Sequence, residues 1–154
     1  MLDMFKKSEN CYLCYSEIKL GKNESLPAVC PCCCADLANP SAEVLQSNIE
    51  CEHIKGTFGI DAGMLFITNT RIFWLKGEVG AEESNGLVRL LSKGGGKISV
   101  NVPLGEVDRI EDCKKMLRKG VTLYTKSGES YNFYIPNLGN PQPLKDLLTP
   151  YANG

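Results

Sequence analysis

The chain has 154 residues and a net charge of −1, with 43% hydrophobic and 23% charged residues, as in an ordinary soluble globular protein. No apolar run approaches the roughly 20 residues that a membrane-spanning helix needs. The first residues, MLDMFKKSEN, also lack the apolar core of a secretory signal. We therefore expect a cytoplasmic protein, in which dense cysteine indicates metal binding more often than disulfides.

The charge is unevenly distributed along the chain. Residues 1–52 carry four Lys and Arg against eight Asp and Glu, a balance of −4. Residues 53–154 carry thirteen against ten, a balance of +3. We interpret this as an acidic, cysteine-rich part followed by a mildly basic part. The weak positive balance of the second part does not indicate a nucleic-acid partner.

Six of the eight cysteines lie in CYLCYSEIKLGKNESLPAVCPCCC, between residues 11 and 34. Two C-x-x-C pairs, Cys11/Cys14 and Cys30/Cys33, are separated by fifteen residues, which is typical of a four-cysteine zinc site. Each turn brings two sulfurs to one ion, and two turns complete a tetrahedron with Zn–S bonds of ~2.3 Å. Because four thiolates leave no open position, we predict a structural zinc ion at these four cysteines.

Two alternatives for this segment are a redox C-x-x-C pair and an iron–sulfur cluster. Pairing Cys30 with Cys32 or Cys34 instead of Cys33 has less favourable spacing. Residues 11–33 resemble a zinc ribbon or a short treble-clef finger, and the resemblance rests on the four cysteines. In many such fingers glycine follows each C-x-x-C, whereas here Tyr15 and Cys34 stand in those places.

Residues 39–49 are predicted to form a short helical linker. Asn39 suits the N-cap, Pro40 the first turn, and Glu43 the positive end of a helix. We therefore divide the chain into a four-cysteine finger (residues 1–38), this linker, and a larger domain (residues 50–154).

From residue 50 onward the apolar periodicity is that of β-strands. MLFITNTRIFWLK predicts a hairpin around residues 68–70, and GLVRLLSKGGGKISVNVPL predicts two strands around three glycines. Val107 and Ile110 lie on a further strand, and GVTLYTKSGESYNFYIPN predicts a second hairpin. With a final helix through residues 144–148, the count is about seven strands and one C-terminal helix.

These elements resemble GRAM-type and bacterial PH-like domains over residues 50–150. The resemblance rests on three segments: GMLFITNTRIFWLK, with its Thr-Asn-x-Arg step, ISVNVPLGEVDRIED, and the hairpin GVTLYTKSGESYNFYI. It implies a mainly β fold in which the finger precedes an antiparallel PH-like barrel of about seven strands with a C-terminal helix. In the family, Thr68, Asn69 and Arg71 would help define the first hairpin. From the residues alone, Arg71 is expected to pair with a nearby carboxylate.

The resemblance implies a binding module, because PH-like domains bind phosphoinositide head groups, other acidic lipids, peptides or proteins. We expect a non-enzymatic adaptor, in which the zinc finger stabilises or extends a PH-like platform for a protein partner or self-association. The chain has one histidine, and no nucleophile-elbow, phosphate-loop, metalloprotease or paired-carboxylate motif is visible, so catalysis is not expected.

The alternative function is peripheral membrane binding to acidic lipid head groups through two basic clusters. They comprise Arg89, Lys93 and Lys97 near the three glycines, and Lys114, Lys115, Arg118 and Lys119 in CKKMLRKG. Glycine N–H groups approach phosphate closely, and each lysine near an anionic surface contributes about 1 kcal/mol. The competing interpretation is a solvated basic loop balanced by Glu111 and Asp112.

Overall fold

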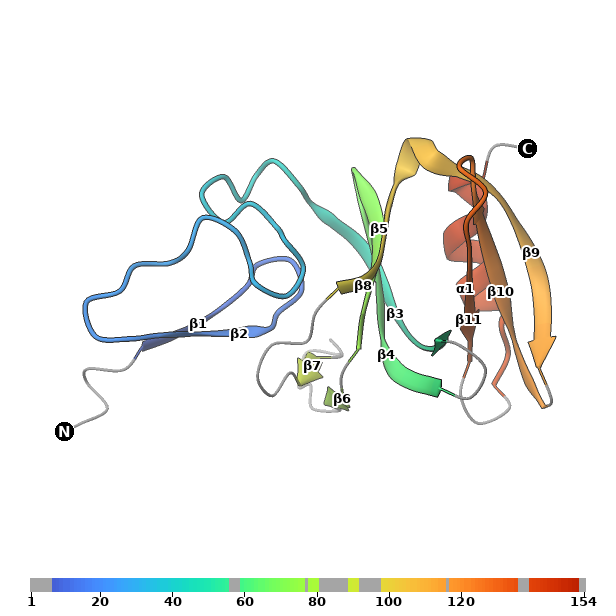
Figure 1. Ribbon diagram of the computed structural model, residues 1–154, viewed down its shortest axis with the longest axis horizontal. Coiled ribbons are helices and arrows are strands. Elements are labelled where there is room, and N and C mark those ends of the chain that lie inside the picture. Colours follow the sequence, from blue (N-terminus) through green and yellow to red (C-terminus); the bar gives the residue numbers. More distant parts are fainter. Residues whose placement is uncertain are drawn as a thin grey trace.

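The computed structural model describes residues 7–55, 59–76, 78–80, 89–91, 98–115, 117–135 and 139–152. Strands dominate it (Figure 1). In chain order they are β1 (Lys7–Asn10), β2 (Glu17–Leu20), β3 (Leu45–Lys55), β4 (Gly59–Thr68), β5 (Arg71–Lys76), β6 (Glu78–Gly80), β7 (Arg89–Leu91), β8 (Ile98–Pro103), β9 (Val107–Lys115), β10 (Arg118–Thr125) and β11 (Ser130–Tyr134). The helices are the 3-10 turns η2 (Leu104–Glu106) and η3 (Thr149–Tyr151) and the α-helix α1 (Gln142–Leu148).

Seven strands form one antiparallel sheet in the order β8-β5-β4-β3-β11-β10-β9. The sheet has a four-stranded and a three-stranded part, which are joined by two residue pairs, Phe133 with His53 and Tyr134 with Glu52. In Figure 1 the two parts lie as separate layers, and α1 lies beside the three-stranded part. Leu144 and Leu148 of α1 are buried in the core between them. The predicted mainly β fold with a C-terminal helix is confirmed.

The prediction of a closed barrel is wrong. The two ends of the sheet, β8 and β9, do not pair with each other in the described part of the chain. The three-residue turn η2 connects them, and the two strands diverge from it into opposite layers (Figure 1). An open sheet therefore keeps two unpaired edges, which a barrel would lack.

The helical linker predicted in residues 39–49 is also wrong. Residues 39–44 form turns and bends, and β3 begins at Leu45. The carboxylate of Asp36 accepts the N–H of Asn39 at 3.2 Å, which caps a turn at the point where the helix was expected. The Val44 N–H donates to the Asn69 side chain at 2.7 Å, and the Val44 carbonyl accepts the Asn69 N–H at 3.1 Å. Long-range partners thus take the backbone groups that a helix would use.

Strands β4 and β5 are buried on both faces, which explains their continuous apolar runs. One face belongs to the core between the two layers and contributes Leu65, Ile67, Ile72 and Trp74. The other face packs against the cysteines of the finger and contributes Met64, Phe66, Phe73 and Leu75. On this second face, Phe66 and Phe73 are cross-strand partners whose stacked rings have centroids 4.9 Å apart.

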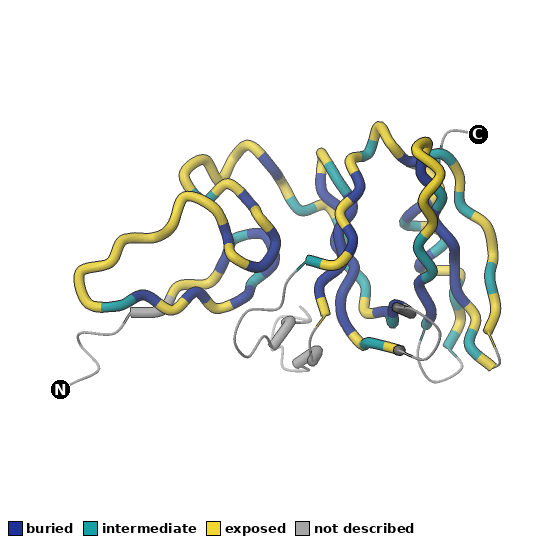
Figure 2. Tube along the Cα trace, viewed as in Figure 1, coloured by how far each residue is buried: buried dark blue, intermediate teal, exposed yellow. Residues whose placement is uncertain are grey.

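The finger, described from residue 7 to residue 38, contains the β1–β2 hairpin and two cysteine turns. Buried and exposed residues alternate along β2, whereas residues 22–29 are exposed (Figure 2). Leu13, Ile18 and Ala35 are buried in the same cluster as Phe66 and Phe73. The finger and the outer face of the sheet therefore share one hydrophobic core.

Candidate functional site

Both C-x-x-C segments fold into the same tight turn. The N–H of Tyr15 donates to the carbonyl of Cys11, and the N–H of Cys34 donates to the carbonyl of Cys30, each at 3.0 Å. Within the turns, the N–H of Leu13 points at the Cys11 sulfur at 3.3 Å, and the N–H of Cys32 points at the Cys30 sulfur at 3.4 Å. Such N–H groups stabilise thiolates, which are the form that binds metal.

The two turns bring four thiols to one point. The Sγ atoms of Cys11 and Cys33 are 3.7 Å apart, and those of Cys14 and Cys30 are 3.9 Å apart. All four sulfurs lie within 4.8 Å of one another and all four cysteines are buried. A tetrahedron with metal–sulfur bonds of ~2.3 Å has edges of about 3.8 Å, so the donor set fits one metal ion.

The remaining cysteines of the segment lie outside this group. Cys32 is buried within the second turn, and Cys34 is exposed. Every cysteine in the chain is a free thiol, so disulfides do not hold the finger together. The predicted set is therefore the one that the fold brings together.

Tyr15 and Cys34, which stand where related fingers have glycine, adopt the left-handed backbone conformation. Their φ angles are 64° and 66°. Side chains with a Cβ atom are strained in this region and glycine is not. The chain thus keeps the turn geometry that glycine normally supplies, at a cost in stability.

The four thiols influence one another's protonation. Hydrogen bonding, chiefly with Cys14, lowers the pKa of the Cys11 thiol to about 7. Hydrogen bonding with Cys11 raises the pKa of Cys33 and lowers that of Cys30. Because a metal binds thiolates, its binding has to release the protons that the cluster retains.

Beside the four cysteines, an ion pair whose side chains are each 11% exposed connects the segment after the finger to the β4–β5 turn. The Glu43 carboxylate accepts hydrogen bonds from Arg71 Nε at 2.8 Å and from Arg71 Nη2 at 3.2 Å. It also accepts the hydroxyl hydrogens of Thr68 at 2.6 Å and Thr70 at 2.9 Å. The expected carboxylate partner of Arg71 is therefore Glu43, 28 positions earlier, which the sequence suggested only as an acidic residue at the positive end of a helix.

The protonation of this pair follows from its surroundings. Burial alone would raise the pKa of Glu43, but hydrogen bonds from Arg71, Thr68 and Thr70 outweigh it and lower that pKa. Burial likewise opposes the charged form of Arg71, but Glu43 raises its pKa, and the negative charge of Cys33 and Cys34 adds to the increase. Arg71 is thus a cation near the cysteine cluster.

The predicted basic residues do not form a single cluster. Lys114 and Lys119 are directly opposed on β9 and β10, as are Lys115 and Arg118. Arg118 donates to the Glu52 carboxylate at 2.8 Å, which holds its charge against β3. In the other predicted cluster, Arg89 lies on β7 and its side chain is outside the described part. Lys93 and Lys97 lie outside the described residues.

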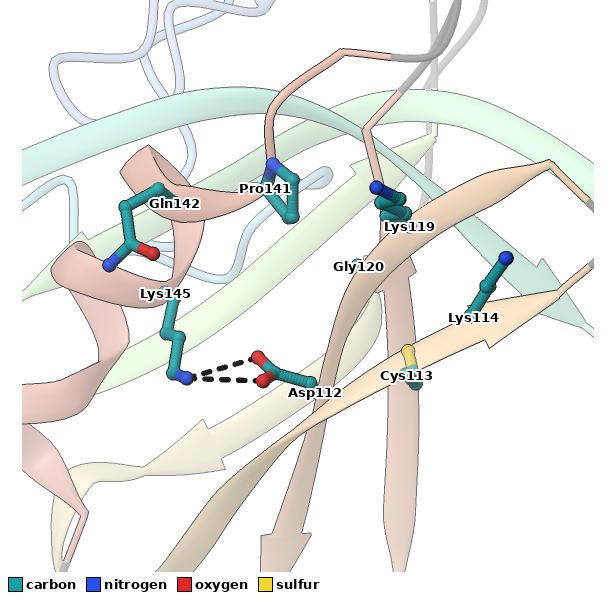
Figure 3. Close-up of a pocket in the computed structure, with 8 residues that line it drawn as sticks. All are labelled: Asp112, Cys113, Lys114, Lys119, Gly120, Pro141, Gln142 and Lys145. Carbon is teal, nitrogen blue, oxygen red and sulfur yellow. Dashed lines mark hydrogen bonds and ion pairs between the residues drawn. The ribbon is translucent and has the colours of Figure 1, made fainter.

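A cavity of about 360 Å³ lies between β9, β10 and the start of α1 (Figure 3). Lys114 and Lys119 line it, as do two α1 residues that the sequence did not single out, Gln142 and Lys145. Lys145 binds the Asp112 carboxylate with N–O distances of 3.1 and 3.2 Å. No local pattern marks Lys145, because its partner lies 33 positions away.

No family model and no curated protein matches the chain. Among solved structures, the chain is similar to the C-terminal domain of an unknown protein from Leishmania infantum. The TM-score is 0.48 at 17% identity, covering 74% of this chain and 89% of that one. Within the described residues, no helix has the length and apolar character needed to cross a bilayer.

Replacing Cys34 by glycine is expected to stabilise the protein, because glycine relieves the left-handed strain at φ 66°. The expected gain in unfolding free energy is about 1 kcal/mol, measured by thermal unfolding of the metal-loaded protein. Cys34→Ala is the matched control, since it removes the thiol and keeps the Cβ atom. An equal effect of the two variants would contradict the strain argument.

Glu43→Gln is expected to lower the unfolding free energy by about 3 kcal/mol at neutral pH, because it leaves Arg71 without its charged partner. The pKa of Glu43 is lowered in the folded state, so its contribution is present above the unfolded pKa and is lost as pH falls. The difference between wild type and variant should therefore be constant down to about pH 5 and shrink below about pH 4.3.

Urea unfolding across this pH range measures that difference. The exposed Glu50, replaced by glutamine, serves as the control and should differ little from wild type at every pH. Acid also weakens metal binding, but it does so in wild type and variant alike. A difference that stays unchanged down to pH values well below about 4 would argue against the ion pair as its source.

Proposed function

We propose that the cysteine centre binds one structural zinc ion. The observation that carries this is the closed shell of four buried sulfurs at tetrahedral separations of 3.7 and 3.9 Å. Thiolate donors in tetrahedral geometry favour Zn²⁺ over hard cations, and four protein ligands leave no position for a substrate or water. The ion would hold the two cysteine turns together, and the turns in turn cover the outer face of the sheet.

The second part of the proposal is that the zinc finger sits on a PH-like domain that serves as a non-enzymatic binding module in the cytoplasm. Strand order supports the PH-like assignment. The meander β3, β4, β5, β8 is followed by the meander β9, β10, β11, and the two adjoin where β3 pairs with β11. The helix α1 follows and packs into the core between them. Seven antiparallel strands followed by a C-terminal helix agree with the resemblance, although the sheet is not closed into a barrel.

The surfaces left for a partner follow from what is already covered. The finger occupies the outer face of β4 and β5, and the core occupies their inner face. The edge strand β9 carries six charged residues among its nine, which protects an edge against strand addition. The other edge strand, β8, has the sequence ISVNVP with no charged residue. We therefore take the β8 edge as the protein-binding surface, with a second copy of the chain as the partner.

The acidic-lipid alternative is favoured by one separate observation. Leu117 is 70% exposed in the β9–β10 turn, next to the four basic residues of these two strands. An apolar side chain beside lysines is the combination that shallow insertion into an anionic bilayer requires. Arg118 is already paired with Glu52, so the contribution to lipid binding would come mainly from the lysines.

Metal analysis tests the zinc proposal. Mass spectrometry of the intact, reduced protein is expected to give one zinc ion per chain. The ion should be lost in Cys11→Ser and in Cys33→Ser, because each removes one of four ligands. Cys34→Ser, which changes a thiol outside the group, is the control and should retain zinc. A different metal, or none in the reduced wild type, would overturn the proposal.

Sedimentation velocity over a range of protein concentrations tests binding at the β8 edge. The wild type is expected to form a dimer at high concentration, and Ser99→Lys should shift it to monomer by placing a charge on that edge. Ser130→Lys is the matched control, because it places the same charge on an exposed serine of β11, which is not an end strand of the sheet. A wild type that remains monomeric throughout would contradict self-association through β8.

A further inference from the structure

We infer that the cavity between β9, β10 and α1 is a binding site for a phosphate-bearing group. It is a concave site of about 360 Å³, at the small end of the range for ligand pockets. Three lysines and one aspartate are the charged residues that line it: Lys114, Lys119, Lys145 and Asp112. The lining therefore carries two more positive than negative charges, in a space suited to a head group.

Two of the lysines lie opposite each other on neighbouring strands and have no carboxylate partner among the described residues. Lys114 and Lys119 are directly opposed in the register of the antiparallel β9–β10 pair. None of the ion pairs in the described part of the chain involves either of them. Like charges directly opposite each other on a sheet are destabilising. An anion that contacts both ammonium groups would remove this repulsion.

Strand alternation directs these two lysines to the side of α1. Lys119 lies two positions before Val121, which is buried in the core that α1 helps to form, so both face the same side of the sheet. Figure 3 shows Lys114 and Lys119 on neighbouring strands, with α1 on the other side of the cavity. The opposed pair Lys115 and Arg118 faces the other way, where Arg118 meets Glu52.

The third lysine is positioned by the wall of the cavity. Lys145 reaches from α1 to both carboxylate oxygens of Asp112, so its ammonium group is held at the cavity while its charge is balanced. The start of α1 supplies no free amide at Gln142, because its N–H donates to the Asn140 side chain at 3.0 Å. Side-chain ammonium groups are therefore the donors available to an anion here.

These features match a phosphate monoester. Such a group carries a charge of about −1.5 to −2 at neutral pH, close to the excess charge of the lining. The same chemistry is offered by a soluble phosphate ester and by the head group of an acidic lipid. Only the lipid source rests on the acidic-lipid alternative proposed above; the site itself does not depend on it.

Titration with inorganic phosphate, followed by amide NMR shifts of Cys113 and Gly120, tests the site directly. The wild type is expected to show saturable shifts at these two cavity residues. The double variant Lys114→Gln/Lys119→Gln should weaken binding by roughly tenfold or more. Lys19→Gln/Lys126→Gln removes the same charge from exposed positions elsewhere and should leave the affinity unchanged. Asp112→Asn should tighten binding severalfold, because it removes the one carboxylate and releases Lys145.

A second arm measures sedimentation with phosphatidylcholine vesicles that contain or lack phosphatidic acid. If the protein binds both phosphate and the acidic vesicles, and both depend on the two lysines, the result supports the cavity site with a lipid as the source of the phosphate. Phosphate binding without vesicle binding supports the site with a soluble source and overturns the lipid alternative. If phosphate causes no amide shifts and the double variant still binds vesicles, the cavity site is overturned. The acidic-lipid alternative is then retained. No shifts and no vesicle binding overturn both.

Discussion

The fold depends on the burial of the outer face of β4 and β5 by the finger. Met64, Phe66, Phe73 and Leu75 are large apolar side chains on a face that would otherwise meet water. Burying such side chains contributes about 1.5–3 kcal/mol each. The finger in turn packs its own buried residues against these four side chains. The finger and this outer face therefore share one core, whereas the core between the two layers contains no described residue of the finger.

Two kinds of interaction hold the two parts in register. Apolar packing is strong but has little directionality, so alone it would allow the finger several orientations on the sheet. The Glu43 carboxylate fixes the orientation, because it accepts directional hydrogen bonds from two nitrogens of Arg71. It also accepts hydrogen bonds from the two threonine hydroxyl groups of the β4–β5 turn. Asn69 adds a reciprocal pair of hydrogen bonds to Val44. The Thr-Asn-Thr-Arg turn thus serves as the attachment point for the segment that leaves the finger.

What the sequence predicted well was set by local chemistry. Cysteine spacing identified Cys11, Cys14, Cys30 and Cys33, because two short turns leave few ways to bring four sulfurs together. Period-two apolar patterns and turn residues located the two hairpins and most strands. The double burial of β4 and β5 also had a visible signal, since MLFI and IFWL are continuous apolar runs and not alternating ones.

What failed depended on partners distant in the chain. Residues 39–44 include residue types that favour the start of a helix. Glu43 instead accepts a hydrogen bond from Arg71, and the Val44 N–H donates to Asn69. The basic run in CKKMLRKG looked like one patch, but strand alternation sends its members to opposite faces of a hairpin. The prediction of a loop there missed that β9 continues to Lys115 and β10 begins at Arg118. Closure of the barrel was likewise a global property that no local pattern encodes.

Because the finger and the sheet share a core, the proposed metal ion would affect more than the finger. If the ion is removed, four thiols lose the bonds that hold two turns together, and the cover over the stacked Phe66 and Phe73 loosens. The molecule would then present a flat, aromatic-rich surface of paired strands, the kind of surface that promotes aggregation and attracts chaperones. If the centre binds zinc as proposed, loss of zinc would thus affect the whole chain, including the sheet edges and the basic cavity.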